Sequence, residues 1–169
     1  LDVMKSSADV ANYNTEFRAL QQQLYAITTE TFNGVSLFAS TTTAGGAMTY
    51  GTDKHTVSVF TSDRGAAGSI VSLNKSALSA ALTFASKTDA TNAATGSGIT
   101  IAAATSSAAI DISDITVSFF TKALENIATL RAENGATMTR LQFAEDHLRL
   151  SASNLEAANS RIMDVDVAT

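Results

Sequence analysis

The feature that most constrains this chain is a run of positions spaced alternately by four and three residues along its C-terminal third. These positions, here called the heptad stripe, are Phe120, Leu124, Ile127, Arg131, Asn134, Met138, Leu141, Glu145, Leu148, Ala152, Leu155, Asn159 and Ile162. The spacing keeps side chains on one side of an α-helix and is typical of helices that pack lengthwise on other helices. Because the chain contains no proline, nothing removes a backbone donor from such a helix. The pattern predicts one long helix from about Ser113 to Asp164.

The heptad stripe is polar at four positions, and further apolar residues lie outside it. The polar positions are Arg131, Asn134, Glu145 and Asn159. Polar residues in such a stripe lower stability but can fix the register and the number of partner helices. The apolar residues outside the stripe are Phe119, Leu130, Phe143 and Leu150. A helix with two apolar faces suits contact with two neighbours, one in its own chain and one elsewhere.

A second helical pattern lies near the N-terminus. Its apolar residues, at spacings of four and three, are Tyr13, Phe17, Leu20, Leu24 and Ile27. We expect Asn14 or Thr15 to cap the start of this helix, and Asn33-Gly34 to form the turn that ends it. An earlier helix would account for the apolar residues Leu1, Met4 and Ala8.

The middle of the chain, residues 41–110, is rich in Thr, Ser, Ala and Gly. Segments 47–50 and 56–60 have the composition of strands and are joined by turn residues, which predicts a hairpin. Residues 69–85 read as a short helix, and residues 88–109 as a loop with one short strand at 99–101.

These patterns together predict a mainly α fold with a small β element. The expected architecture is an elongated, discontinuous helical rod domain made of residues 1–40 and 111–169. Residues 41–110 form an insertion of β-hairpin, short helix and loop packed on this rod.

Composition excludes several classes of function. The formal charge is −5 and no Lys/Arg cluster occurs, so neither nucleic acid nor an anionic membrane surface is an expected partner. No apolar run approaches the roughly 20 residues of a membrane span. Cysteine is absent, which removes disulfides, thiolate metal sites and thiol nucleophiles.

No constellation of residues points to an enzyme. The two histidines, His55 and His147, have no partner at ligand or catalytic spacing. Asp164 and Asp166 have the spacing of the first two acids of a calcium loop, without its glycine and distal glutamate. Gly96 and Gly98 lack the strand and helix of a nucleotide site. We therefore expect no catalytic residues, no cofactor and no metal.

Short motifs at both ends of the chain carry a family resemblance. The N-terminal stretch 15–24 reads TEFRALQQQL and leads to TFNG at 31–34. The C-terminal motifs are ENGA at 133–136, Arg140-Leu141, Asn154-Leu155 and ANSRIMDVDVA at 158–168. In the middle, TYGTD at 49–53 and TVSV at 56–59 resemble a small β element on a helical rod. Together these motifs are similar to those of bacterial flagellin.

The resemblance implies a repeating subunit of the flagellar filament that packs its long helices against other copies of itself for swimming motility. It further implies contacts with flagellar junction and cap proteins. The protein would lie outside the cell in the flagellum, after export through the flagellar secretion channel without a cleaved signal peptide. In the family, extreme terminal helices line the lumen and drive polymerisation. The resemblance implies that they lie outside this chain, which would leave a rod-domain fragment that is monomeric at micromolar concentration.

The same resemblance supplies candidate residues for subunit contact or for ordering the end of the rod. They are Asn33, Gly34, Arg140, Asn159, Arg161, Asp164 and Asp166. Arg161 stands out chemically because a guanidinium can bridge carboxylates through two hydrogen bonds, as lysine cannot.

One departure from the family concerns the host. Segment 1–10 is similar to a family segment contacted by the host innate receptor for flagellin. Ser6 and Ser7 replace the acid and leucine expected after Lys5, which argues against recognition by that receptor. Two alternatives to a filament subunit stay open: a flagellin-like surface adhesin or ligand-binding protein, and a hook–filament junction protein of the same fold.

Overall fold

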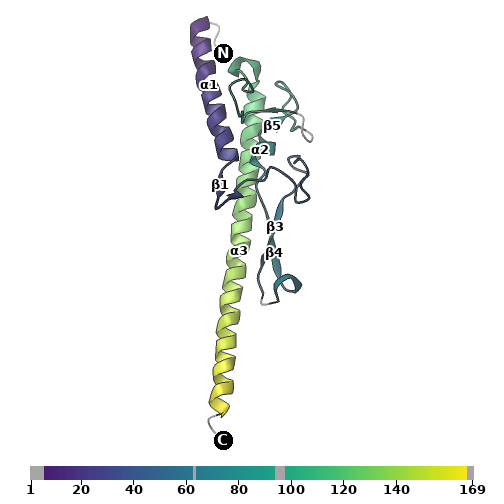
Figure 1. The fold of residues 1–169 in the computed structure, drawn as a ribbon, viewed down its shortest axis with the longest axis vertical. Helices are drawn as coiled ribbons and strands as arrows, with labels where there is room; N and C mark the ends of the chain where they lie inside the picture. The colour runs from purple at the N-terminus through teal and green to yellow at the C-terminus, as the bar shows by residue number, and fades with distance from the viewer. Residues whose placement is uncertain (1–5, 63, 94–97, 167–169) are drawn as a thin grey trace. The chain divides into compact units, whose positions relative to one another are not determined.

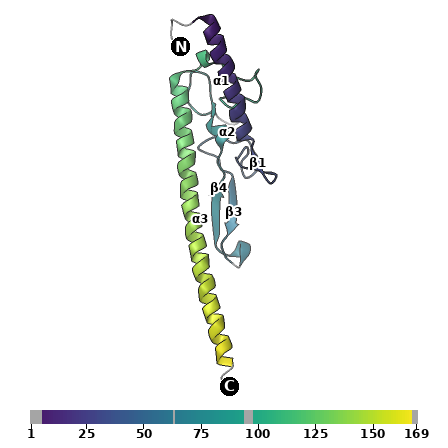
Figure 2. The same cartoon turned by 90° about the vertical axis from the view of Figure 1, so that its left-hand side faces the viewer.

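The computed structural model describes residues 6–62, 64–93 and 98–166, with side chains as far as residue 164. The elements are α1 (Ser7–Thr28), β1 (Thr31–Phe32), β2 (Val35–Ser36), β3 (Thr56–Phe60), β4 (Ile70–Asn74), α2 (Leu78–Ala81), β5 (Thr83–Phe84), β6 (Ile99–Thr100) and α3 (Val117–Asp166), with 3-10 turns at Gly65–Ala67 and Ile112–Asp114 (Figure 1, Figure 2). Among the described residues, the strands pair as β1–β2, β3–β4 and β5–β6. The predicted mainly α fold with a small β element is confirmed.

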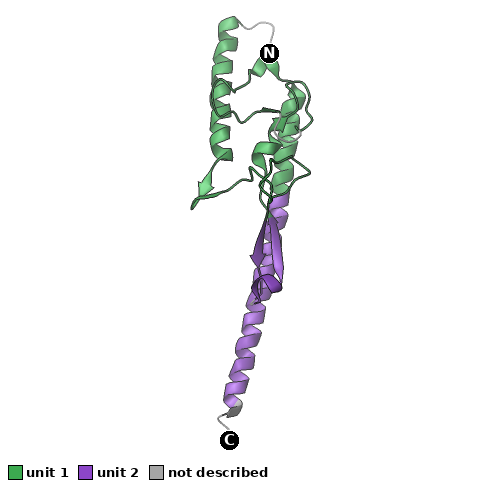
Figure 3. Ribbon diagram, turned by 45° about the vertical axis from the view of Figure 1, so that its right-hand side comes forward, with its two compact units in different colours: residues 1–56, 74–132 green, residues 57–73, 133–169 purple. Residues whose placement is uncertain are grey.

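The chain divides into two compact units (Figure 3). The first unit contains residues 1–56 and 74–132, and the second contains residues 57–73 and 133–169. The start of α3 therefore belongs to the first unit and the rest of the helix to the second.

The helix α1 begins earlier than the apolar pattern predicts. Its N-cap is Ser6, whose hydroxyl accepts a hydrogen bond from the Asp9 amide at 3.3 Å. The Asp9 carboxylate in turn accepts one from the Ser6 amide at 3.2 Å. This reciprocal pair satisfies donors that a helix start leaves unpaired, so the helix can begin here. Ala8 lies inside α1 rather than in an earlier helix, while Leu1 and Met4 lie outside the described residues.

The helix α1 ends at Thr28, before the predicted turn. The hydroxyls of Thr28 and Thr29 donate to the Tyr25 carbonyl, at 2.7 and 3.2 Å. Asn33 and Gly34 instead join β1 to β2, with φ values of 50° and 76°. Two consecutive residues with positive φ form the tight two-residue turn that matches the twist of a hairpin. The hairpin is therefore a separate element that follows the helix.

The strand β3 forms where predicted, but it pairs with β4 rather than with segment 47–50. That segment is held in a turn, because the Asp53 carboxylate accepts a hydrogen bond from the Thr49 amide at 2.7 Å and the Asp53 amide donates to the Thr49 carbonyl at 3.1 Å. β4 occupies part of the range 69–85 that was predicted as a helix, of which Leu78–Ala81 is helical. The β-branched pair Ile70-Val71 favours the strand over the helical spacing of the nearby leucines.

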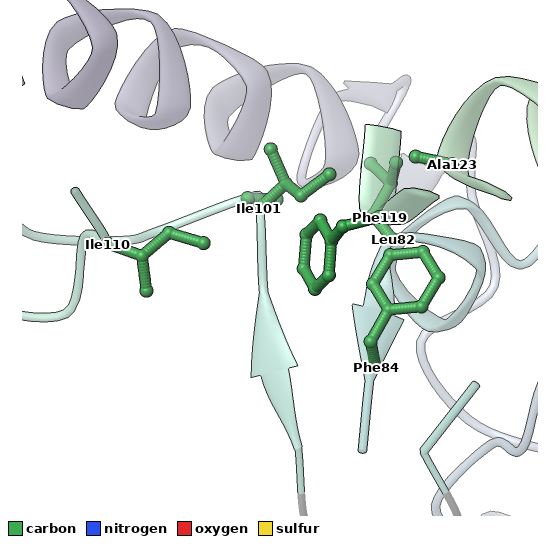
Figure 4. Close-up of a cluster of buried hydrophobic side chains, with 7 residues drawn as sticks. Leu82, Phe84, Ile101, Ile110, Phe119 and Ala123 are labelled. Carbon is green, nitrogen blue, oxygen red and sulfur yellow. The ribbon is translucent and has the colours of Figure 1, made fainter. Parts of the chain in front are cut away.

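The hydrophobic core lies in the first unit (Figure 4). Its buried members are Leu82, Phe84, Ile101, Ala102, Ile110, Phe119 and Ala123. The rings of Phe84 and Phe119 lie with centroids 4.3 Å apart. The segment predicted as loop with a short strand does contain β6, and it also supplies Ile101 and Ala102 to this core.

Candidate assembly surface

The packed face of α1 is largely polar. The Gln21 side chain is 1% exposed, donates to the Ile110 carbonyl at 2.7 Å and accepts from the Ile110 amide at 3.1 Å. The Arg18 guanidinium lies 2.7 Å from the Asp111 carboxylate. Asn14 Oδ1 accepts a further backbone hydrogen bond from the same segment at 3.0 Å. These contacts fasten α1 to the segment that precedes α3 and fix which face of the helix turns inward.

Because these polar contacts fix the inward face of α1, part of its predicted apolar face is exposed. Phe17 and Leu24 pack against the core. The other three residues of that face, each between 41% and 55% exposed, are Tyr13, Leu20 and Ile27. The apolar pattern therefore identified the helix but only partly its buried side.

In the first unit, the fully buried positions of α3 lie next to the heptad stripe, while Ile127 of the stripe itself packs against the core partly buried. The buried side chains on this part of the helix are Phe119, Ala123, Asn126 and Leu130. Within the stripe, the Phe120 ring meets the Phe17 ring edge-on at 5.9 Å, whereas Leu124 is 67% exposed. Each of these buried residues lies one position before a stripe residue. Because successive helical residues point about 100° apart, the stripe residues then point partly toward solvent.

Two buried amides, Gln21 and Asn126, were not anticipated from the sequence. The Asn126 amide donates to the Ala81 carbonyl at 2.8 Å and to the side-chain oxygen of Asn92 at 3.1 Å. Both amides lie three or four residues from packed apolar residues of their own helix. That spacing is the sequence signal that could have predicted their burial. A polar residue on a packed helix face must find a hydrogen-bond partner when it is buried.

In the second unit, α3 lies beside β3 and β4 (Figure 1, Figure 2). Arg140 donates to the Ser72 carbonyl at 3.4 Å, and Leu141 is half-buried. The large apolar side chains that remain exposed here are Met138, Phe143, Leu148, Leu150, Leu155, Ile162 and Met163. Leu155 and Ile162, both in the heptad stripe, are each 70% exposed. Large apolar residues of the stripe in the second unit thus stay exposed as far as Ile162.

The other candidate residues fall into two groups. Asn33 and Gly34 form the turn of the β1–β2 hairpin, flanked by exposed Phe32 and Val35. The candidates at the end of α3 are Asn159, Arg161, Asp164 and Asp166. The first three side chains of this group are exposed, and the side chain of Asp166 lies outside the described residues.

A cleft of about 330 Å³ opens between α3 and the β3–β4 loop. The residues that line it are Thr61, Ser62, Ser69, His147, Leu148, Ser151, Ala152 and Leu155. Its walls are hydroxyl groups and apolar carbon, with the His147 imidazole as the titratable group among them.

The described residues offer little material for catalysis. Within residues 6–62, 64–93 and 98–166, no three His, Asp or Glu side chains are placed to hold a metal ion. His55 Nδ1 lies 2.7 Å from the Thr41 carbonyl oxygen. Gly98 has a packing role, since a Cβ there would lie 2.5 Å from Ala93 Cβ. Two hydrogen bonds from Thr91 lower the pKa of the Asp89 carboxyl on an exposed loop.

The helices in the described part of the chain are also too short or too polar to cross a membrane. What the geometry does offer is a 50-residue helix with large apolar side chains exposed along much of its length. Such a surface is characteristic of a structural protein whose helices pack on other chains.

Comparison with known proteins agrees with this class. Residues 117–169 match the bacterial flagellin C-terminal helical region. The chain is 46% identical over 46 residues to the "Putative flagellin YvzB" of Bacillus subtilis (strain 168), a match that covers 27% of this chain and 29% of that protein. No solved structure matches the chain significantly. The protein is therefore flagellin-like, and the family match lies in residues 117–169.

Proposed function

We propose that this protein is a structural subunit of the bacterial flagellar filament that assembles with other copies of itself and serves swimming motility. The observation that carries the proposal is the set of exposed apolar positions in the heptad stripe, because they lie in the same residues, 117–169, that match flagellin. A solvent-exposed stripe of this kind lowers solubility unless another chain covers it. Helix packing between subunits gives it a physical purpose.

The proposal extends to location and partners. The subunit would lie outside the cell, in the flagellum, after export through the flagellar secretion channel. Its main partners would be further copies of the chain, with junction and cap proteins at the two ends of the filament. No enzymatic activity is part of this role.

We further propose that residues 1–40 and 111–169 act as the rod domain of the assembled subunit, with 41–110 as its insertion. The contact residues would include Arg140 and the exposed end of α3, where Asn159, Arg161 and Asp164 follow the last apolar positions of the stripe. A guanidinium at this place can pair with a carboxylate of a neighbouring subunit through two hydrogen bonds.

Immunogold electron microscopy of cells that produce the protein tests the proposal. An antibody raised against the proposed insertion, residues 41–110, should label sheared filaments along their whole length, because the proposal leaves this segment outside the contacts between helices. Label confined to one short band beside the hook would identify a junction protein instead. Label spread over the cell surface, with no filament, would identify an adhesin and contradict the proposal.

A further inference from the structure

The chain contains the dipeptide Asn-Gly twice, in two different backbone conformations. Asn33-Gly34 forms the turn of the β1–β2 hairpin, and Asn134-Gly135 lies inside α3. All four residues are exposed, so solvent reaches both pairs. The two sites therefore differ in backbone conformation and hydrogen bonding rather than in chemistry or access to water.

Asn-Gly is chemically reactive because glycine offers no side chain to shield its amide. The glycine nitrogen attacks the asparagine Cγ, loses its proton and expels the side-chain nitrogen as ammonia, which leaves a five-membered cyclic imide. Water then opens the imide at either carbonyl, giving aspartate or isoaspartate. The reaction needs no co-reactant besides water, and it is faster at higher pH because the attacking amide must give up its proton.

The backbone of α3 opposes this attack at Asn134. Inside an α-helix, the amide of Gly135 donates to the carbonyl four residues earlier, so its nitrogen is engaged and held away from the preceding side chain. Reaching the ring geometry requires local unfolding in the middle of a 50-residue helix.

The hairpin opposes the attack far less. β1 and β2 contribute two residues each, and their pairing consists of Thr31 with Ser36 and Phe32 with Val35. An isolated two-stranded hairpin is marginally stable, and this one has a mostly exposed surface. A brief opening therefore suffices to let the Gly34 nitrogen approach Asn33 Cγ.

We infer that Asn33 is a site of spontaneous deamidation in the folded protein, and that Asn134 is protected. The modification adds one negative charge to the hairpin tip, where Phe32 is 74% exposed and Val35 is 63% exposed. Isoaspartate also lengthens the backbone by one carbon, which breaks the register of Phe32 with Val35. An apolar tip thereby becomes charged and misaligned as the protein ages.

Peptide mapping by mass spectrometry tests this inference on the purified chain. The chain is incubated at mildly alkaline pH, in native buffer and in concentrated urea, and deamidation at positions 33 and 134 is followed in time. Fragmentation that distinguishes isoaspartate from aspartate identifies the product. An Asn33→Gln variant serves as the control, because its longer side chain cyclises much more slowly.

In native buffer we expect position 33 to react at least about tenfold faster than position 134, since local opening in the helix is rarer by that factor or more. In urea the two rates should converge, because the unfolded chain presents the same dipeptide twice. Equal native rates at the two positions, or faster reaction at position 134 than at position 33, would overturn the inference.

Discussion

At the scale of single residues, two side-chain amides connect parts of the first unit that are distant in sequence. Gln21 bonds to both backbone groups of Ile110, 89 residues further along the chain, in the way that one strand pairs with another. Asn126 joins α3 to the carbonyl of Ala81. Because these amides are buried, removing one leaves its partners without water as well as without a hydrogen bond.

Replacing Gln21 by alanine should therefore lower the free energy of unfolding by about 1–3 kcal/mol, the usual cost of buried unsatisfied groups. Gln23 is the matched control, since it lies on the same helix and is exposed. Gln23→Ala should change the free energy of unfolding by no more than about 0.5 kcal/mol. Urea denaturation followed by circular dichroism gives both values, and equal effects would show that the Ile110 contact contributes nothing.

At the scale of elements, α3 has a different environment in each unit. The part of α3 in the first unit buries Phe119 and Leu130, whereas the part in the second unit exposes Leu155 and Ile162. The buried pair lies outside the heptad stripe and the exposed pair lies within it. The second predicted apolar face is divided in the same way, because its residues Phe143 and Leu150 are exposed whereas Phe119 and Leu130 are buried.

Matched truncations on this one helix should separate the two roles. Leu130→Ala removes a buried side chain and should lower the free energy of unfolding by about 2–5 kcal/mol. Leu155→Ala removes an exposed one and should change it by about 0.5 kcal/mol or less. Thermal or urea unfolding of the two variants checks this, and a large loss for Leu155→Ala would mean that its side chain is covered within the chain.

At the scale of the whole molecule, the exposed positions of the heptad stripe and the end of α3 matter for the proposed assembly rather than for folding. A contact that is weak in one pair of subunits is repeated at every position of a filament, so small losses accumulate. Changes at these places should leave the isolated chain stable and alter the polymer.

The double variant Leu155→Ser with Ile162→Ser should fold as the parent does and should reduce incorporation into filaments. The physical reason is the loss of apolar area that a neighbouring helix would cover. Glu156→Ser is the control, because it changes an exposed residue of the same helix outside the stripe. Quantifying each variant in sheared filaments against its cellular amount gives the answer, and equal incorporation of the double variant and the control would exclude the stripe as a contact.

Arg161→Ala tests the end of α3. The residue is exposed, and exposed charges contribute little to folding, so the melting temperature should hardly change. Filament length and swimming speed of cells that carry the variant should fall, because a charge-assisted contact is lost at each subunit. Swimming that matches the parent would assign Arg161 to an ordinary solvated helix end.

The sequence by itself determined the features that depend on near neighbours in the chain. Spacings of three and four residues, together with the absence of proline, predicted α1 and α3, and Asn33-Gly34 predicted a turn, because these follow from local backbone geometry and side-chain direction. Only the tertiary structure decided which β-rich segment pairs with β3, which face of α1 turns inward and which part of the heptad stripe stays exposed. Those outcomes depend on contacts such as Gln21 with Ile110, whose partners are 89 residues apart and carry no mutual signal in one sequence.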